Sequence, residues 1–214
     1  MGKDRQGGDT QEGNKEMKRY YPFLVSLFFL LSIVQSGCLS LREAYVPQDL
    51  LTNGWYEDSK DEEKGSSLLG IEKWSTKVYR KGDVAYLSVT SLRFIILHDK
   101  EELLKKVDTD IMNQAVKYGI NINYSSKIGG KRETCEGHET VFVVYTGEKE
   151  GHEYRFIGEV WSCSKSGISV ICMGYADMSE IDGIRGWKEM VEDPEGTIEG
   201  LKGENGLIYN VICH

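Results

Sequence analysis

The stretch that decides the fold is Asp99-Lys-Glu-Glu-Leu-Leu-Lys-Lys-Val-Asp-Thr-Asp-Ile-Met-Asn-Gln-Ala-Val-Lys-Tyr-Gly119. Asp99 is a suitable N-cap, Glu102 can complete a capping box, and Gly119 suits the left-handed residue that ends a helix. Apolar residues recur every three or four positions, as on one face of an α-helix; they are Leu103, Leu104, Val107, Ile111, Met112, Ala115 and Val116. We therefore expect an amphipathic helix over residues 100–118.

Segments that alternate apolar and polar residues, as strands do, lie on both sides of this helix. They are Lys73–Arg80 and Asp83–Leu97 before it, and Ile120–Ser126, Thr140–Thr146, His152–Ser162 and Ser169–Ala176 after it. A shorter helix is expected after Ser179, and Leu207–Val211 is expected to form a last short edge strand. This order predicts an α+β fold, with an antiparallel β-sheet of about six strands and two helices packed on it.

The element order resembles the α/β sandwich of PsbP-type extracytoplasmic domains over about residues 70–192. The resemblance is one of architecture. No specific motif accompanies it, so it implies a fold and transfers no functional residue.

The segment from Met17 to Cys38 predicts an export signal. Lys18 and Arg19 precede the uncharged apolar run Phe23–Val34, which is shorter than the ~20 residues that span a bilayer. Small residues and a cysteine follow, Ser36-Gly37-Cys38, which resembles the signal of prokaryotic lipoproteins. That resemblance implies cleavage before Cys38 and a diacylglyceryl thioether on its sulfur, although Gln35 replaces the usual aliphatic residue. The alternative is a short, uncleaved membrane anchor.

The chain therefore divides into four predicted parts. Residues 1–16 are polar and glycine-rich, and they are disordered or a mis-assigned start. Residues 17–37 are the signal peptide, residues 38–67 a lipidated tether and surface loop, and residues 68–214 a single α+β domain. The expected location is the outer face of the cell membrane, with a lipid anchor.

The net charge and the aromatic residues indicate which binding partners to expect. The chain of 214 residues has a formal net charge of −8, which argues against non-specific binding of nucleic acid. Four aromatic residues are expected to share one face of the sheet, namely Tyr145, Tyr154, Trp161 and Tyr175. Such a face could bind a small apolar ligand or an extended peptide, although core packing explains aromatic residues equally well. The expected partners are therefore the membrane, through the lipid anchor, and an envelope protein or a small apolar ligand.

After Cys38 four cysteines remain, an even number that suits two disulfides in an exported protein. A type II′ turn at Gly167-Ile168 would place Cys163 opposite Cys172, at a spacing that a disulfide can bridge. Cys135 and Cys213 would then form the second disulfide. The alternative is four buried free thiols.

Zinc binding is the competing interpretation of the same residues. Cys135 and His138 have a Cys-x2-His spacing, and Cys213-His214 supplies two more potential ligands. Adjacent residues seldom coordinate one ion, however, so the sequence predicts no metal and no cofactor.

No catalytic motif is present, and the four histidines are scattered. The sequence therefore favours a non-enzymatic binding or assembly module without catalytic residues. The alternative is a secreted hydrolase that uses His138 and His152 around the Cys135 loop, or a metal-binding protein that uses residues around Cys135 and His138.

Overall fold

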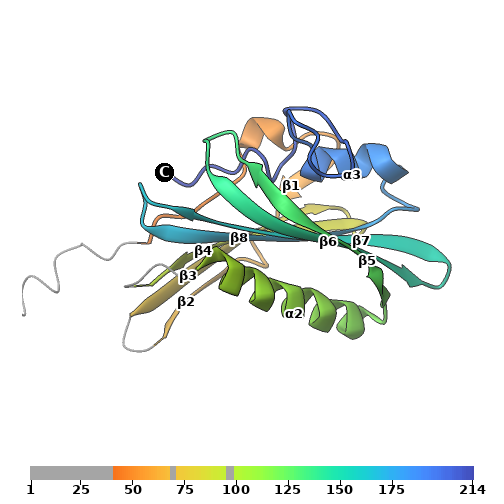
Figure 1. The fold of residues 1–214 in the computed structure, drawn as a ribbon, viewed down its shortest axis with the longest axis horizontal. Helices are drawn as coiled ribbons and strands as arrows, with labels where there is room; N and C mark the ends of the chain where they lie inside the picture. The colour runs from red at the N-terminus through yellow and green to blue at the C-terminus, as the bar shows by residue number, and fades with distance from the viewer. Residues whose placement is uncertain (1–40, 68–70, 95–98) are drawn as a thin grey trace, which may run out of the picture. The chain divides into compact units, whose positions relative to one another are not determined.

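The computed structural model describes residues 41–67, 71–94 and 99–214 (Figure 1). The predictions for residues 1–37 and for Cys38 lie outside these ranges. The elements, in chain order, are η1 (Gln48–Leu50), β1 (Trp55–Glu57), β2 (Glu63–Ser67), β3 (Glu72–Lys81), β4 (Ala85–Arg93), α2 (Lys100–Tyr118), β5 (Asn121–Glu133), β6 (Glu139–Lys149), β7 (His152–Cys163), β8 (Ile168–Asp177) and α3 (Gly183–Val191).

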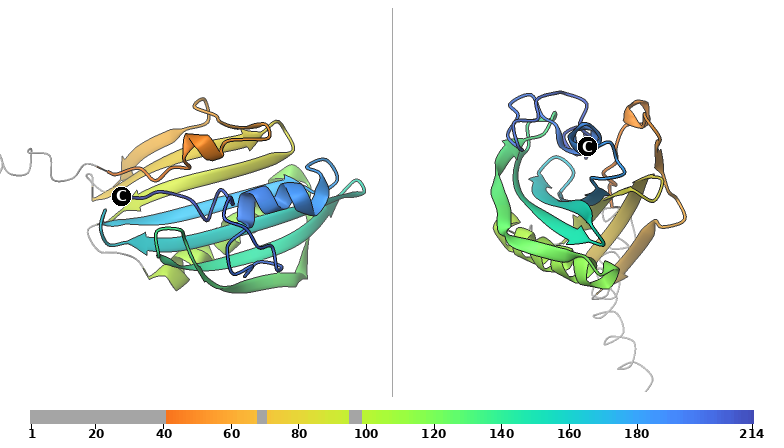
Figure 2. Two further views of the ribbon diagram at one scale, coloured as in Figure 1. Left: turned by 90° about the horizontal axis from the view of Figure 1, so that it is seen from above. Right: turned by 90° about the vertical axis from the view of Figure 1, so that its right-hand side faces the viewer.

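The strands form one antiparallel sheet in the order β1-β3-β4-β8-β7-β6-β5, and β2 pairs with β3 (Figure 2). The α+β class and the two helices are confirmed. The sheet has eight strands, however, and not about six.

The two additional strands lie within residues 38–67, which were predicted to be tether and surface loop. Glu63–Ser67 reads Glu-Lys-Gly-Ser-Ser and carries no apolar alternation, so its pairing with β3 depends on backbone hydrogen bonds that leave no hydrophobic pattern. The predicted edge strand Leu207–Val211 is wrong. Those residues form turns, and their apolar side chains are buried instead.

Helix α2 covers one face of the sheet and packs mainly on β7 and β6 (Figure 1). It begins as predicted at Asp99, whose side chain accepts a hydrogen bond from the backbone N–H of Glu101, and it ends at Gly119 with φ +70°. Its buried residues are Leu103, Val107, Ile111 and Ala115. The C-terminal end of the predicted apolar stripe is exposed. Val116, which belongs to it, is 78% accessible to solvent.

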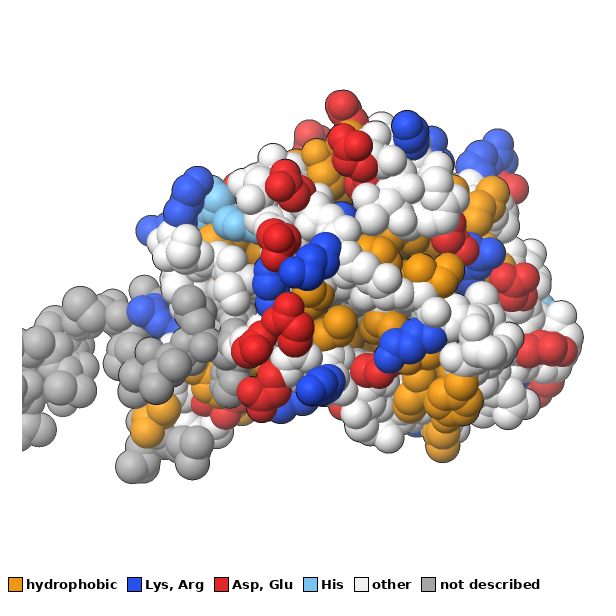
Figure 3. All heavy atoms as spheres, in the orientation of Figure 1, with side chains coloured by type: hydrophobic (Ala, Val, Ile, Leu, Met, Phe, Trp, Pro, Cys, Tyr) orange, Lys and Arg blue, Asp and Glu red, His pale blue; other side chains and the backbone are white. Residues whose placement is uncertain are grey.

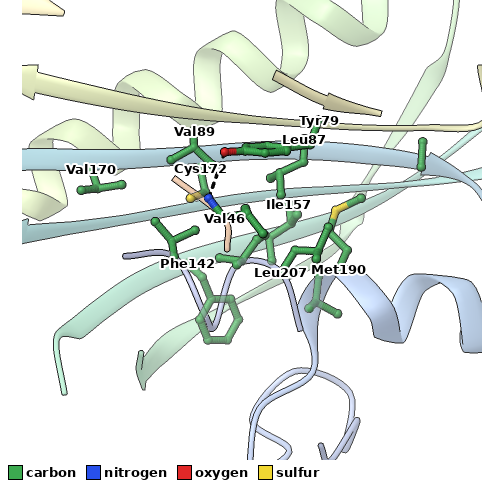
Figure 4. Packing of buried hydrophobic residues seen from close by; sticks show 14 of the residues in the cluster. Val46, Tyr79, Leu87, Val89, Phe142, Ile157, Val170, Cys172, Met190 and Leu207 are labelled. Carbon is green, nitrogen blue, oxygen red and sulfur yellow. Dashed lines mark hydrogen bonds between the residues drawn. The ribbon is translucent and has the colours of Figure 1, made fainter. Parts of the chain in front are cut away.

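The opposite face is covered by α3 and by the irregular C-terminal segment, residues 192–214 (Figure 2, left). Figure 4 shows the core between these layers, where Leu207 and Met190 meet Ile157 and Phe142 of the sheet. The C-terminal segment has little regular structure, so buried side chains and hydrogen bonds hold it in place.

A second irregular segment, residues 41–46, lies on this same face. The backbone N–H of Val46 donates to the Tyr79 hydroxyl at 2.9 Å (Figure 4), and that of Ala44 donates to Ser91 Oγ at 2.6 Å. Between them, Tyr45 forms an isolated antiparallel bridge with Ile212 through two backbone hydrogen bonds of 3.0 and 2.9 Å. The start of the described chain is therefore fastened to its last residues.

The predicted aromatic face is only partly correct. Tyr145, Tyr154 and Tyr175 lie on the α2 side of the sheet, whereas Trp161 is fully buried on the opposite side. The odd positions of β7 face the α3 side and its even positions face α2, so Trp161 cannot share a face with Tyr154.

Candidate metal centre

The β7–β8 hairpin does not have the predicted register. Cys163 faces Ile168, and Cys172 faces Glu159. A four-residue loop, residues 164–167, joins the strands, and the Gly167 N–H bonds to the Cys163 carbonyl at 2.8 Å. Gly167 supplies the left-handed residue at the end of this loop, with φ +66°, and does not open a two-residue turn.

With this register Cys163 and Cys172 do not lie opposite each other. No two of the four described cysteines lie at disulfide distance, neither Cys163 and Cys172 nor Cys135 and Cys213. Cys172 is buried in the middle of the sheet, and Cys135 is exposed. The other two cysteines approach each other instead.

Four side chains from three parts of the chain converge at one end of the sheet. They are His138 from the β5–β6 loop, Cys163 from the end of β7, and Cys213 and His214 from the C-terminal segment. One ligand atom from each of the four lies within 4.8 Å of all the others. The Cys-x2-His spacing therefore contributes only its histidine, and Cys163 takes the place that the zinc interpretation assigned to Cys135.

The loop that carries His138 is a tight turn built by its own backbone. The Thr134 N–H bonds to the His138 carbonyl at 3.0 Å, and the His138 N–H bonds to Thr134 Oγ1 at 3.2 Å. Gly137 has a φ of +74°, which an L-residue adopts only with strain. The Cys135 N–H reaches the Tyr209 carbonyl at 2.9 Å and joins this loop to the C-terminal segment.

The positions of Cys213 and His214 follow from the residues just before them. Val211 is buried, and Ile212 is held by its bridge to Tyr45. The Cys213 N–H then donates to Glu136 Oε2 at 3.2 Å. The side chains of Cys213 and His214 therefore both reach the cluster with His138 and Cys163, although side chains of adjacent residues seldom meet at one site.

The distances within the cluster approach those of a coordination shell. Cys213 Sγ lies 3.2 Å from His138 Nε2 and 3.9 Å from His214 Nδ1, and Cys163 Sγ lies 3.6 Å from His214 Nδ1. Zinc bonds of about 2.3 Å to sulfur and 2.0–2.1 Å to nitrogen, arranged as a tetrahedron, place neighbouring ligand atoms roughly 3.3–3.8 Å apart. Two thiols and two imidazoles at these spacings form a Cys2His2 set.

Burial controls the protonation of the ligands. The two cysteines are essentially inaccessible, at 0% and 1% exposure for Cys163 and Cys213. Burial and the neighbouring Cys163 thiol raise the pKa of Cys213 well above its usual range. Burial also lowers the pKa of His138, which favours the neutral imidazole that a metal ion requires.

Three further groups surround the four ligands. Glu136 Oε2 lies 3.3 Å from His214 Nδ1 and 3.8 Å from His138 Nε2, and Lys165 Nζ lies 3.0 Å from His214 Nε2. Figure 3 shows pale blue histidine atoms beside basic side chains at this end of the surface. The third group is the buried Trp161 indole N–H, which lies near enough to Cys213 to lower the pKa of that thiol, although no acceptor among the described residues meets hydrogen-bond geometry with it.

The histidine pair considered for a hydrolase does not converge. His138 precedes β6 and His152 follows it, so the two lie at opposite ends of that strand. His152 Nδ1 instead contacts Asp177 Oδ2 at 2.8 Å. Within the described residues, the hydrolase interpretation loses the residues on which it was based.

A hollow of about 620 Å³ lies between the β5–β6 end and the C-terminal segment, and Arg132, Glu133, Glu139, Asp193 and Tyr209 are among its lining residues. The lining is mostly charged, unlike the apolar groove expected for a small apolar ligand. The Arg132 guanidinium is already bonded to Glu159 and Asp193, so it offers no free cation to an anionic ligand.

Comparisons with protein-family models, curated protein sequences and solved structures gave no match for this chain. Within residues 41–67, 71–94 and 99–214, no helix is both long and apolar enough to cross a membrane.

Proposed function

We propose that this protein is an extracytoplasmic zinc-binding module, anchored to the membrane by lipid, in which one Zn²⁺ closes the C-terminal end of the domain. The observation that carries the proposal is the convergence of His138, Cys163, Cys213 and His214 within 4.8 Å. Each ligand comes from a segment that is independently fixed, so the site is assembled by the fold.

The ligand chemistry favours zinc. Two thiolates and two imidazoles in a tetrahedral arrangement suit Zn²⁺, whereas Mg²⁺ and Ca²⁺ prefer oxygen ligands. Four protein ligands also fill the tetrahedral shell, which is typical of structural zinc sites, while catalytic sites keep a position open for water or substrate. This supports a structural role and the non-enzymatic interpretation of the sequence.

The buried indole of Trp161 adds an independent argument. Its N–H lacks a hydrogen-bond partner among the described residues, which is costly in a fully buried side chain. Zinc would hold Cys213 as a thiolate, and a thiolate accepts an N–H hydrogen bond better than a thiol does. Metal binding would therefore supply the acceptor that Trp161 lacks.

Metal content tests the proposal directly. We expect the full-length protein to bind one equivalent of Zn²⁺, and Co²⁺ in its place to give the visible absorption bands of a tetrahedral thiolate site. Cys163→Ser should weaken the thiolate bands, because Cys213 is then the one thiolate left in the cluster, and it should bind zinc substoichiometrically because it removes a ligand. Cys135→Ser is the matched control and should behave as wild type, since Cys135 is an exposed cysteine outside the cluster. Equal losses in both variants, or no binding by the wild type, would refute the proposal.

The membrane location is proposed from the sequence alone. A diacylglyceryl group on Cys38 supplies two acyl chains, which suffice for stable attachment without a spanning helix. The zinc-closed domain would then stand at the outer face of the membrane as a binding or assembly module for another envelope protein.

Lipid attachment has its own test. Cys38→Ala should release the full-length protein from membranes, or leave an uncleaved precursor without lipid, when cells are fractionated and labelled with a fatty acid. Cys135→Ser should label and fractionate as wild type. If Cys38→Ala keeps both the label and the membrane location, Cys38 is not the lipidated residue.

A further inference from the structure

We infer that Cys163 and Cys213 form a redox pair that bound metal protects: in the metal-free protein a disulfide oxidant joins them, and in the metal-bound protein it does not. The inference concerns the regulation of the zinc site, so its second half depends on the proposed function. Its first half, the identity of the disulfide, depends only on the geometry of the two thiols.

The geometry singles out this pair. Their Sγ atoms lie within 4.8 Å of each other, and Cys163 Sγ is also 3.8 Å from the Cys213 carbonyl oxygen. Cys135 and Cys172 are not part of the cluster. A disulfide needs an S–S separation near 2.05 Å, which side-chain rotation and a small shift of the irregular C-terminal segment can provide.

The two cysteines differ in how firmly they are held. Cys163 ends a strand and pairs with Ile168 in the sheet. Cys213 lies in a segment without regular structure, one residue beyond the Tyr45–Ile212 bridge. Both thiols are buried, so an external oxidant must reach Cys213 when this segment opens locally.

The reaction balances as ordinary thiol–disulfide exchange. The Cys213 thiolate attacks one sulfur of the oxidant, glutathione disulfide for example, forming a mixed disulfide and releasing one glutathione thiolate. The Cys163 thiolate then attacks Cys213 Sγ, forming the Cys163–Cys213 bond and releasing the second thiolate. The two protein thiols are oxidised, the oxidant disulfide is reduced, and the two thiol protons pass to solvent or to the released thiolates.

Metal and oxidation exclude each other, because each uses the same two sulfur atoms. A zinc-bound thiolate cannot form a disulfide without leaving the metal. Conversely, the disulfide leaves only His138 and His214 as ligands, too few to complete a tetrahedral site. In an oxidising compartment outside the membrane, metal-free protein would therefore be trapped in a form that no longer takes up zinc.

The experiment uses full-length protein, stripped of metal under reducing conditions, freed of reductant, and then exposed to glutathione disulfide. Remaining thiols are blocked with a maleimide at successive times, and the disulfides are mapped by non-reducing peptide analysis. We expect the thiol count to fall by two and the Cys163–Cys213 peptide pair to appear. Zinc at 100 times its dissociation constant leaves about 1% of sites free and should slow this reaction about 100-fold.

Two variants distinguish a failure of the redox inference from a failure of the zinc proposal. Cys135→Ser should oxidise and be protected as wild type, whereas Cys163→Ser should form no intramolecular disulfide with Cys213. A disulfide that joins Cys213 to Cys135 would overturn the inference. So would an oxidation rate that zinc leaves unchanged in protein whose Co²⁺ spectrum shows an occupied site. The absence of that spectrum, with the Cys163–Cys213 disulfide still formed, would instead refute the zinc proposal and leave the redox pair standing.

Discussion

Zinc at 1,000 times its dissociation constant is expected to raise the unfolding temperature of this protein by roughly 8–16 °C. Binding to the folded state alone contributes about 4 kcal/mol at that ratio, and 1 kcal/mol corresponds to about 2–4 °C in a chain of this size. The shift follows from topology, because the ligands come from three segments that only the folded chain brings together.

Thermal unfolding with zinc and with a chelator measures this effect, and Cys163→Ser supplies the control. The variant should show a much smaller zinc-dependent shift, because its three remaining ligands bind zinc more weakly than four. Hydrogen exchange should localise the difference. The amides of Tyr45 and Ile212 are expected to exchange faster without metal, since their bridge directly precedes Cys213. A shift of equal size in Cys163→Ser would show that zinc binds elsewhere.

Much of the fold follows from local patterns in the chain. The 3.6-residue repeat between Asp99 and Gly119, with its capping residues, predicted both ends of α2 correctly. Alternating residues likewise identified six of the strands, because the central strands bury a face against a helix or the C-terminal segment; β5, which is mostly exposed, still alternates Ile122 and Tyr124 with asparagines. β1 and β2 were missed because they are short, lie at an edge of the sheet and, in β2, carry no apolar residue.

The convergence of the four cluster residues could not be predicted from such patterns, for a specific reason. These residues lie on segments far apart in sequence, and the contribution of Cys163 depends on the register of one hairpin. A two-residue turn at Gly167-Ile168 and a four-residue loop ending at Gly167 both use the conformational freedom of that glycine. The longer loop moves Cys172 away from Cys163 and leaves the latter free to meet Cys213. The zinc interpretation of the sequence contains three of the four cluster residues, His138, Cys213 and His214, and differs from the structure in naming Cys135 in place of Cys163.

The buried ion network around Arg132 supplies the second large prediction. The Arg132 side chain is 1% exposed, that of Glu159 is 0% and that of Asp193 is 2%. Arg132 donates from Nε to Glu159 Oε1 at 2.8 Å and from Nη1 to Asp193 Oδ2 at 3.1 Å. Nη1 also donates to the carbonyl of Val191, the last residue of α3, so the network joins β5 and β7 to the end of α3 and to Asp193 beyond it.

Arg132→Met is expected to lower the free energy of unfolding by about 3–5 kcal/mol, because it leaves two buried carboxylates without their cation. Urea denaturation measures this loss. Lys127→Ala is the control, since Lys127 pairs with Asp108 at the surface with a side chain 49% exposed, and it should cost less than about 1 kcal/mol.

The double variant Arg132→Met/Glu159→Leu distinguishes the cost of an unpaired charge from the value of the ion pair itself. Removing both partners eliminates the buried Glu159 carboxylate, and the remaining Asp193 still accepts from the Thr197 N–H at 3.2 Å. We therefore expect the double variant to be more stable than Arg132→Met. If it is less stable, the pair itself stabilises the fold, and the large loss in Arg132→Met cannot be assigned to the desolvated carboxylates. A loss in Arg132→Met no larger than that in Lys127→Ala would show that water reaches the network.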